Sequence, residues 1–134
     1  MKQIAIFLAE GFEEIEGLTV VDILRRAGIT IDMVSITGSV KVTGSHGIEI
    51  TADKTISATD FTKLDMIVLP GGMPGTKNLE SCETLMKQVD AFAKEEKYLA
   101  AICAAPSIYG HRGLLSGKRA CCYPGFESHL TGAK

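Results

Sequence analysis

Short apolar runs that carry little charge recur along the chain, and they predict the strands of a sheet. Residues 3–9, 64–69 and 98–103 are runs of this kind. Continuous apolar runs of this length are typical of strands that are buried on both faces, as in a parallel sheet. Residues 29–36 alternate between apolar and polar side chains, and residues 118–123 form one more run, so we expect a strand at each.

Between the strands, apolar residues recur at the spacing of an amphipathic helix. This spacing predicts a helix over residues 15–27 that stops at Gly28. A second helix is predicted after Ser81, whose hydroxyl can cap it, and a third over residues 105–112. We therefore expect strands and helices to alternate through most of the chain.

This alternation predicts an α/β fold: an open, doubly wound, mostly parallel sheet with helices on both faces. Only residues 40–43 and 48–51 depart from it, and they predict a small hairpin. In such folds the ligand crevice lies beyond the carboxyl ends of the strands. Segment 10–16, the pair Gly71-Gly72 and Cys103 all follow predicted strands. The fold therefore brings these three to one edge of the sheet.

Cys103 stands where a predicted strand turns sharply into a predicted helix. Small residues, Ala104 and Ala105, follow it, and Pro106 suits the first turn of a helix. Free N–H groups and the positive end of the helix dipole favour a thiolate there. The alternative is an inert cysteine buried at the end of a core strand. The crevice location favours the reactive thiol.

Composition narrows the classes of protein that fit. A chain of 134 residues is long enough for one domain with one core, and a net charge of −2 gives no reason to expect a nucleic-acid partner. No apolar stretch reaches the roughly 20 residues of a membrane span, and the start lacks a signal-peptide layout. The 4 cysteines form no C-x-x-C pair, which predicts reduced thiols, a cytoplasmic location and no metal.

The segments around the predicted crevice resemble a known family. The residues that carry the resemblance are Glu-Gly-Phe-Glu-Glu-Ile-Glu at 10–16, Arg-Arg-Ala-Gly at 25–28, Val-Leu-Pro-Gly-Gly at 68–72 and Ala-Ala-Ile-Cys-Ala-Ala-Pro at 100–106. In this order and spacing they resemble the ThiJ/PfpI superfamily, and within it the DJ-one branch. The resemblance covers nearly the whole chain. It implies a flavodoxin-like fold, similar to class I glutamine amidotransferases, and a homodimer.

The resemblance also implies roles for individual residues. Cys103 takes the position of the oxidisable nucleophile, and Glu16 that of the carboxylic acid that hydrogen-bonds its sulfur. The backbone N–H groups of Gly72 and Ala104 line an oxyanion pocket. The physical reading agrees, because a carboxyl group beside a thiolate is expected to be neutral and to donate a hydrogen bond. Glycines at Gly71 and Gly72 let backbone N–H groups approach a reacting oxygen closely.

Two departures from the family pattern concern histidines. Close relatives place a histidine before the proline of the last turn, where this chain has Tyr123, a poor base at neutral pH. Protease-like members carry a histidine directly after the nucleophile, where this chain has Ala104. His46, on the predicted hairpin turn, matches a basic position in relatives and is a candidate pocket residue, although a surface role is the favoured interpretation.

Other chemically interesting side chains are given simpler interpretations. Glu13 and Glu14 are expected to be solvated charges at a helix start. Cys121 and Cys122 are adjacent on a predicted strand, so we expect opposite orientations and small buried hydrophobes. His111 and His129 are interpreted as incidental. Cys82, at a helix start, is expected to be at most mildly reactive, and the sequence offers no partner for it.

Residues 1–134 are expected to form a single ThiJ/PfpI-like domain that lacks its C-terminal strands and helix, because relatives continue with further elements. Lys134 is the kind of residue that a trypsin-like protease leaves at a new C-terminus. We therefore expect a nicked domain, whose partner would be its own cleaved C-terminal fragment; the intact mass of the purified material tests this.

The sequence predicts a cysteine enzyme of the glyoxalase or deglycase type, which acts on reactive 2-oxoaldehydes or on their protein adducts. Its partners would be a small carbonyl compound or a glycated protein. Cys103 would form a hemithioacetal and Glu16 would move the proton, with no cofactor. The alternative is an oxidative-stress sensor or redox-regulated chaperone that signals by oxidation of Cys103. A protease or amidase, or a thiamine-pathway protein, fits less well.

Overall fold

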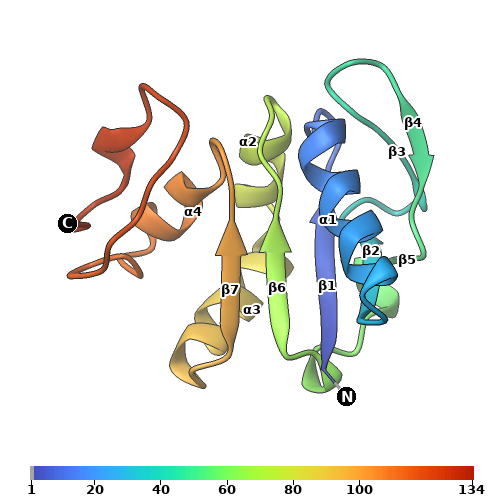
Figure 1. Ribbon diagram of the computed structural model, residues 1–134, viewed down its shortest axis with the longest axis horizontal. Coiled ribbons are helices and arrows are strands. Elements are labelled where there is room, and N and C mark those ends of the chain that lie inside the picture. Colours follow the sequence, from blue (N-terminus) through green and yellow to red (C-terminus); the bar gives the residue numbers. More distant parts are fainter. Residues whose placement is uncertain (1) are drawn as a thin grey trace.

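The computed structural model describes residues 2–134, and its centre is a parallel sheet of five strands in the order β5-β2-β1-β6-β7. The strands are β1 (Gln3–Leu8), β2 (Thr30–Ser35), β5 (Lys54–Thr55), β6 (Met66–Leu69) and β7 (Tyr98–Ala101). The helices are α1 (Glu14–Arg26), α2 (Gly75–Glu80), α3 (Glu83–Lys94) and α4 (Pro106–His111). Short 3-10 turns are η1 (Ile56–Ala58), η2 (Phe61–Lys63) and η3 (Glu127–His129). In Figure 1 the arrows of the sheet point the same way, and the chain leaves every strand at one edge.

The two faces of the sheet pack against different elements. Ala5 and Phe7 of β1 belong to the core cluster that α2, α3 and α4 complete, whereas Ile6 and Leu8 belong to a second cluster with Val21 of α1. This division follows from the period of a strand, whose successive side chains point to opposite faces. The predicted doubly wound, flavodoxin-like α/β fold is confirmed.

A small antiparallel hairpin, β3 (Lys41–Thr43) with β4 (Glu49–Thr51), lies beside α1 and confirms the predicted hairpin. It is held to the loop after β1 by backbone hydrogen bonds. The N–H of Gly11 donates to the carbonyl of Thr43 at 2.9 Å, and the N–H of Ser45 donates to the carbonyl of Phe12 at 2.8 Å. The hairpin therefore covers the start of α1.

Two helix predictions need correction. Residues 75–80 form α2, which the sequence did not suggest, because a helix of 6 residues that begins at a glycine has too few turns to show a period. Ser81 is the C-cap of α2 instead of an N-cap, and Cys82 caps α3. The hydroxyl of Ser81 donates to the carbonyl of Lys77 at 2.9 Å.

The strand predicted over residues 118–123 is absent from the described chain, and β7 is the edge of the sheet. Residues 119–122 have no regular secondary structure, and past the end of β7 the N–H of Tyr123 donates to the carbonyl of Cys103 at 2.8 Å. One such bond does not make a ladder.

The C-terminal segment lies beyond β7 and is fixed to α4 (Figure 1). Nδ1 of His111 lies 2.7 Å from a carboxylate oxygen of Glu80, and its Nε2 lies 2.8 Å from Nδ1 of His129. The backbone of His129 also occupies the space that a side chain at position 110 would need, so Gly110 allows the two segments to pack together. These histidines do not line the cavity at Cys103; they join η3 to α4 and α2. No helix among residues 2–134 is long and apolar enough to cross a membrane.

Candidate active site

Cys103 lies in the turn between β7 and α4, with a backbone conformation that is unusual for a residue with a side chain. Its φ is +65°, in the left-handed region that residues other than glycine rarely adopt. Such a conformation costs on the order of 1–3 kcal/mol and persists only where the surroundings impose it. The turn therefore holds the thiol in one fixed position above the end of β7.

Glu16 reaches this turn from the first turn of α1. Its Oε1 accepts a hydrogen bond of 3.0 Å from the N–H of Gly71, and its carboxyl group hydrogen-bonds the Cys103 thiol. A Cβ added at Gly71 would lie 2.7 Å from both Cys103 Cβ and Glu16 Oε1. Glycine is thus required at this position, because no other residue lets the three groups meet.

The next residue, Gly72, has a φ of +94°, and a Cβ there would collide with the backbone of the loop after β1. The N–H groups of Gly72 and Ala104 both reach the sulfur of Cys103. The structure therefore brings together the Cys103 thiol, the Glu16 carboxyl group and two backbone donors, the groups that the sequence singles out.

The electrostatics of the thiol differ from the expected ones. Burial raises the pKa of Cys103, the hydrogen bond and negative charge of Glu16 raise it further, and the N–H groups of Ala104 and Gly72 lower it only in part. The expected preference for a thiolate is wrong in direction. The helix that follows is only 6 residues long, so its dipole is weak, and burial outweighs it.

A cavity of about 310 Å³ opens at this site. It is lined by Glu16, Ala101, Ile102, Cys103, Cys121, Cys122, Tyr123 and Pro124. Cys121 is exposed and Cys122 is half-buried, so the interpretation of both as buried hydrophobes is wrong. Both residues nevertheless line the cavity, from a segment that does not pair with β7. No histidine lines this cavity in the described chain.

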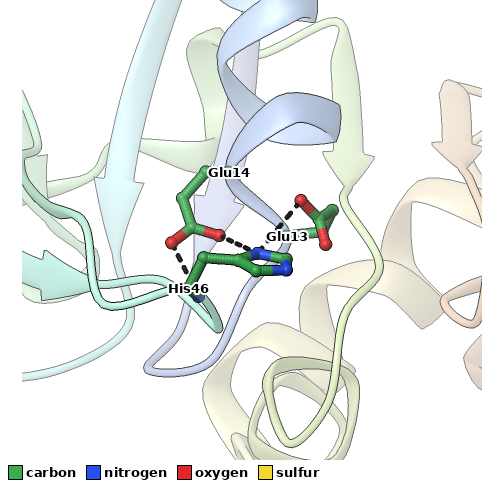
Figure 2. A group of neighbouring side chains, drawn as sticks. All are labelled: Glu13, Glu14 and His46. Atoms are coloured by element: carbon green, nitrogen blue, oxygen red, sulfur yellow. Dashed lines mark hydrogen bonds and ion pairs between the residues drawn. The ribbon is translucent and has the colours of Figure 1, made fainter.

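His46 lies elsewhere, between the carboxylates of Glu13 and Glu14 (Figure 2). Its Nδ1 is 3.0 Å from Glu14 Oε1 and 3.5 Å from Glu13 Oε1, and its backbone N–H donates to Glu14 Oε2 at 2.8 Å. Glu14 also accepts from the N–H of Ile48 and the hydroxyl of Ser45. Glu14 is 5% exposed, so the interpretation of this residue as a solvated charge is wrong.

Glu13, Glu14 and His46 are also the group of possible metal ligands in residues 2–134, with ligand atoms within 4.8 Å of one another. Protein N–H and O–H groups already donate to both oxygens of Glu14. We therefore interpret the cluster as an ion pair that fastens the hairpin to α1.

The Glu14 ion pair leads to a prediction about stability and pH. Burial opposes the charge of Glu14, but its hydrogen bonds, from its own N–H and from His46 and Ile48, lower its pKa to about 2. The hydrogen bond to Glu14 raises the pKa of His46. The stabilisation that ionised Glu14 contributes is lost as the pH falls toward the lowered pKa of Glu14. The stabilisation that protonated His46 contributes is lost as the pH rises through the raised pKa of His46.

Glu14→Gln is therefore expected to lower the free energy of unfolding by about 1.5–3 kcal/mol, the range for hydrogen bonds to a charged group. The loss is expected to be largest between pH 4.5 and 6.5, the ordinary values of the two side chains. Urea denaturation across pH measures it, and Glu13→Gln, which removes the longer contact, is the matched control. An equal loss at every pH would contradict the ion pair.

Comparison with known proteins places this site in a family. The family model for the DJ-1/PfpI family matches residues 2–134. Protein DJ-1 homolog B of Arabidopsis thaliana is 39% identical over 131 residues, which are 97% of this chain and 30% of that protein. Protein dj-1beta of Drosophila melanogaster is 32% identical over 130 residues, covering 97% of this chain and 70% of the fly protein.

Solved structures give the same result. The structure of oxidized Toxoplasma gondii DJ-1 superimposes with a TM-score of 0.92 at 33% identity, and it covers 100% of this chain and 76% of that one. The chain spans about a third of the length of the two Arabidopsis relatives that it matches. The fold, the elbow at Cys103 and the match over residues 2–134 lead to one conclusion: the chain belongs to the DJ-1/PfpI family.

Proposed function

We propose that the chain carries a cofactor-independent, cysteine-dependent activity on reactive 2-oxoaldehydes or their adducts. The observation that supports this most strongly is that Cys103 and Glu16 line one small cavity, with the N–H of Gly71 donating to Glu16 beside them. A cavity of about 310 Å³ suits a substrate of a few heavy atoms, at the lower end of the usual range for ligand pockets.

The first step joins the thiol to the aldehyde. Glu16 takes the thiol proton of Cys103, the sulfur attacks the aldehyde carbon, the C=O π bond breaks, and the oxygen becomes an oxyanion. The N–H groups of Gly72 and Ala104, which reach the sulfur, are placed to donate to that oxygen. Protonation of the oxyanion gives a hemithioacetal. Glu16 Oε1 already accepts from Gly71, so Oε2 is the atom that carries the mobile proton.

The later steps need only proton transfers and water. Glu16 removes the proton from the carbon that bears sulfur, giving an enediol, and returns a proton to the neighbouring carbon, giving a thioester. Water then cleaves the carbon–sulfur bond, which releases a 2-hydroxy acid and restores the thiol. The sum is the addition of one water to the 2-oxoaldehyde, so no external oxidant or reductant is needed.

Lactate formation from methylglyoxal by the reduced chain tests this proposal. We expect lactate to form in proportion to protein, and the Tyr123→Phe variant to retain most of this activity, because a phenol is a poor base and Glu16 remains. A folded, fully reduced chain that forms no lactate would overturn the proposed activity. Glycated peptides in the same assay separate deglycation from action on the free aldehyde.

A hydrolase of the protease type has less support. Such enzymes pair the cysteine with an imidazole, and neither Ala104 nor Tyr123 supplies one. His46, the remaining candidate from the sequence, contacts Glu13 and Glu14 and does not line the cavity. We also propose a cytoplasmic homodimer. On α1, the exposed side chains of Ile15 and Ile23 offer an apolar stripe for the contact between protomers.

A further inference from the structure

Three of the chain's cysteines surround one cavity. Cys103, Cys121 and Cys122 all line the space of about 310 Å³ beside Glu16, whereas Cys82 lies at the N-terminus of α3. None of the four is in a disulfide. The carbonyl chemistry proposed above uses only the first of them, and it leaves the presence of the other two thiols unexplained.

A backbone hydrogen bond holds Cys122 next to Cys103. The carbonyl of Cys103 accepts at 2.8 Å from the N–H of Tyr123, and that N–H belongs to the peptide group that Cys122 forms with Tyr123. A disulfide needs its two Cα atoms about 4.4–6.8 Å apart, so the two backbones must lie side by side, as they do at this hydrogen bond. Cys121 is one residue further away and is exposed.

We propose that Cys122 is a resolving thiol for Cys103, and that the pair reduces hydroperoxides through a Cys103–Cys122 disulfide. The proposal rests on Cys103 as the reactive group of the proposed function, and not on the carbonyl chemistry. Its substrate is a hydroperoxide that fits the cavity, and its second co-reactant is a dithiol reductant.

The reaction balances in three steps. The Cys103 thiolate attacks the terminal oxygen of the hydroperoxide, the O–O bond breaks, and the alkoxide takes up a proton to leave as an alcohol or water. The peroxide gains two electrons, and Cys103 becomes a sulfenic acid. The Cys122 thiolate then attacks the Cys103 sulfur, the S–O bond breaks, and hydroxide leaves and is protonated to water. The dithiol reduces the disulfide and is itself oxidised.

The environment of Cys122 fits a thiol that reacts only after Cys103 has become a sulfenic acid. Burial raises its pKa, and the charges of Glu127 and Cys121 raise it further. The pKa of Cys103 is raised as well, so the two thiols differ in position: Cys103 lies beside Glu16 and the N–H groups of Gly72 and Ala104. Without a resolving thiol, further peroxide would carry Cys103 on to the sulfinic acid, which thiols do not reverse.

The test is one molar equivalent of hydrogen peroxide added to the reduced full chain, followed by peptide mapping by mass spectrometry. We expect a Cys103–Cys122 disulfide, with the loss of two hydrogens and of two titratable thiols. Cys122→Ser is expected to lose this disulfide and, with two equivalents of hydrogen peroxide, to gain two oxygens at Cys103. Cys121→Ser and Cys82→Ser are the matched controls, and both are expected to keep the disulfide.

A Cys103 sulfinic acid beside a free Cys122 in the wild-type chain would overturn the proposal, as would a disulfide to Cys121. Because the wild-type map is itself decisive, the test holds even if a variant folds poorly. The peroxide experiment contains no aldehyde and the lactate assay contains no peroxide. Failure of the resolving thiol and failure of the carbonyl activity are therefore distinguishable.

Discussion

Cys103→Ala is expected to reduce lactate formation from methylglyoxal by ~10³-fold or more, because the hemithioacetal cannot form without the sulfur and the remaining groups act with it as a unit. The fold is expected to survive. The side chain is small, and an alanine at this position would keep the same strained backbone, so the free energy of unfolding should change little. Initial rates and urea denaturation on the same preparations measure both effects.

The strain at Cys103 supplies a control for this prediction. Cys103→Gly also removes the sulfur, but glycine adopts a φ of +65° without cost. We expect this variant to be as inactive as Cys103→Ala and more stable by about 1 kcal/mol, within the cost of a left-handed residue. Lactate formation that persists in both folded variants would show that another group attacks the aldehyde.

Glu16→Gln is expected to reduce turnover by ~10²–10⁴-fold, the usual loss when a general acid–base is removed. Glutamine keeps an oxygen for the N–H of Gly71 and an N–H for the sulfur, but it has no proton to exchange. Since the charge of Glu16 raises the pKa of Cys103, alkylation of the thiol should not shift to higher pH in this variant. The pH profile of alkylation and the steady-state rate are the measurements.

Glu16→Leu separates the two roles of the carboxyl group. Leucine removes both the hydrogen bond and the negative charge that raise the pKa of Cys103, so we expect alkylation of Cys103 at neutral pH to be no slower, together with lost turnover. Full activity in Glu16→Gln would show that Glu16 only shapes the pocket. Slower alkylation in both variants would show instead that Glu16 lowers the pKa of Cys103 by donating a hydrogen bond to its sulfur.

Much of the fold could be predicted because it depends on local patterns. The strand β1 lies within the run predicted at 3–9, and α1 closely matches the predicted helix over 15–27. The segments around Cys103, Glu16 and Gly71-Gly72 could be placed at one edge because parallel strands share the direction of their carboxyl ends. These predictions required no knowledge of which side chains touch.

The errors occur where contacts between distant segments decide the outcome. Glu14 is at a helix start, where a charge is normally solvated, but a hairpin more than 30 residues away covers it. The run at 118–123 has the composition of a strand, but it has no ladder with β7 in residues 2–134. The orientation of Cys121 and Cys122 depends on that difference, so no period in the sequence could have indicated it.

The walls of the cavity differ in how much change they tolerate. The reacting centre is tightly constrained, since any Cβ at Gly71 would lie 2.7 Å from Cys103 Cβ. Tyr123 and Pro124 also line the cavity but lie outside the sheet, where side chains can be exchanged without breaking a strand ladder. We therefore expect the substrate range to change through substitutions in this part of the wall, in natural relatives or in a mutant library. The reacting centre is expected to stay constant.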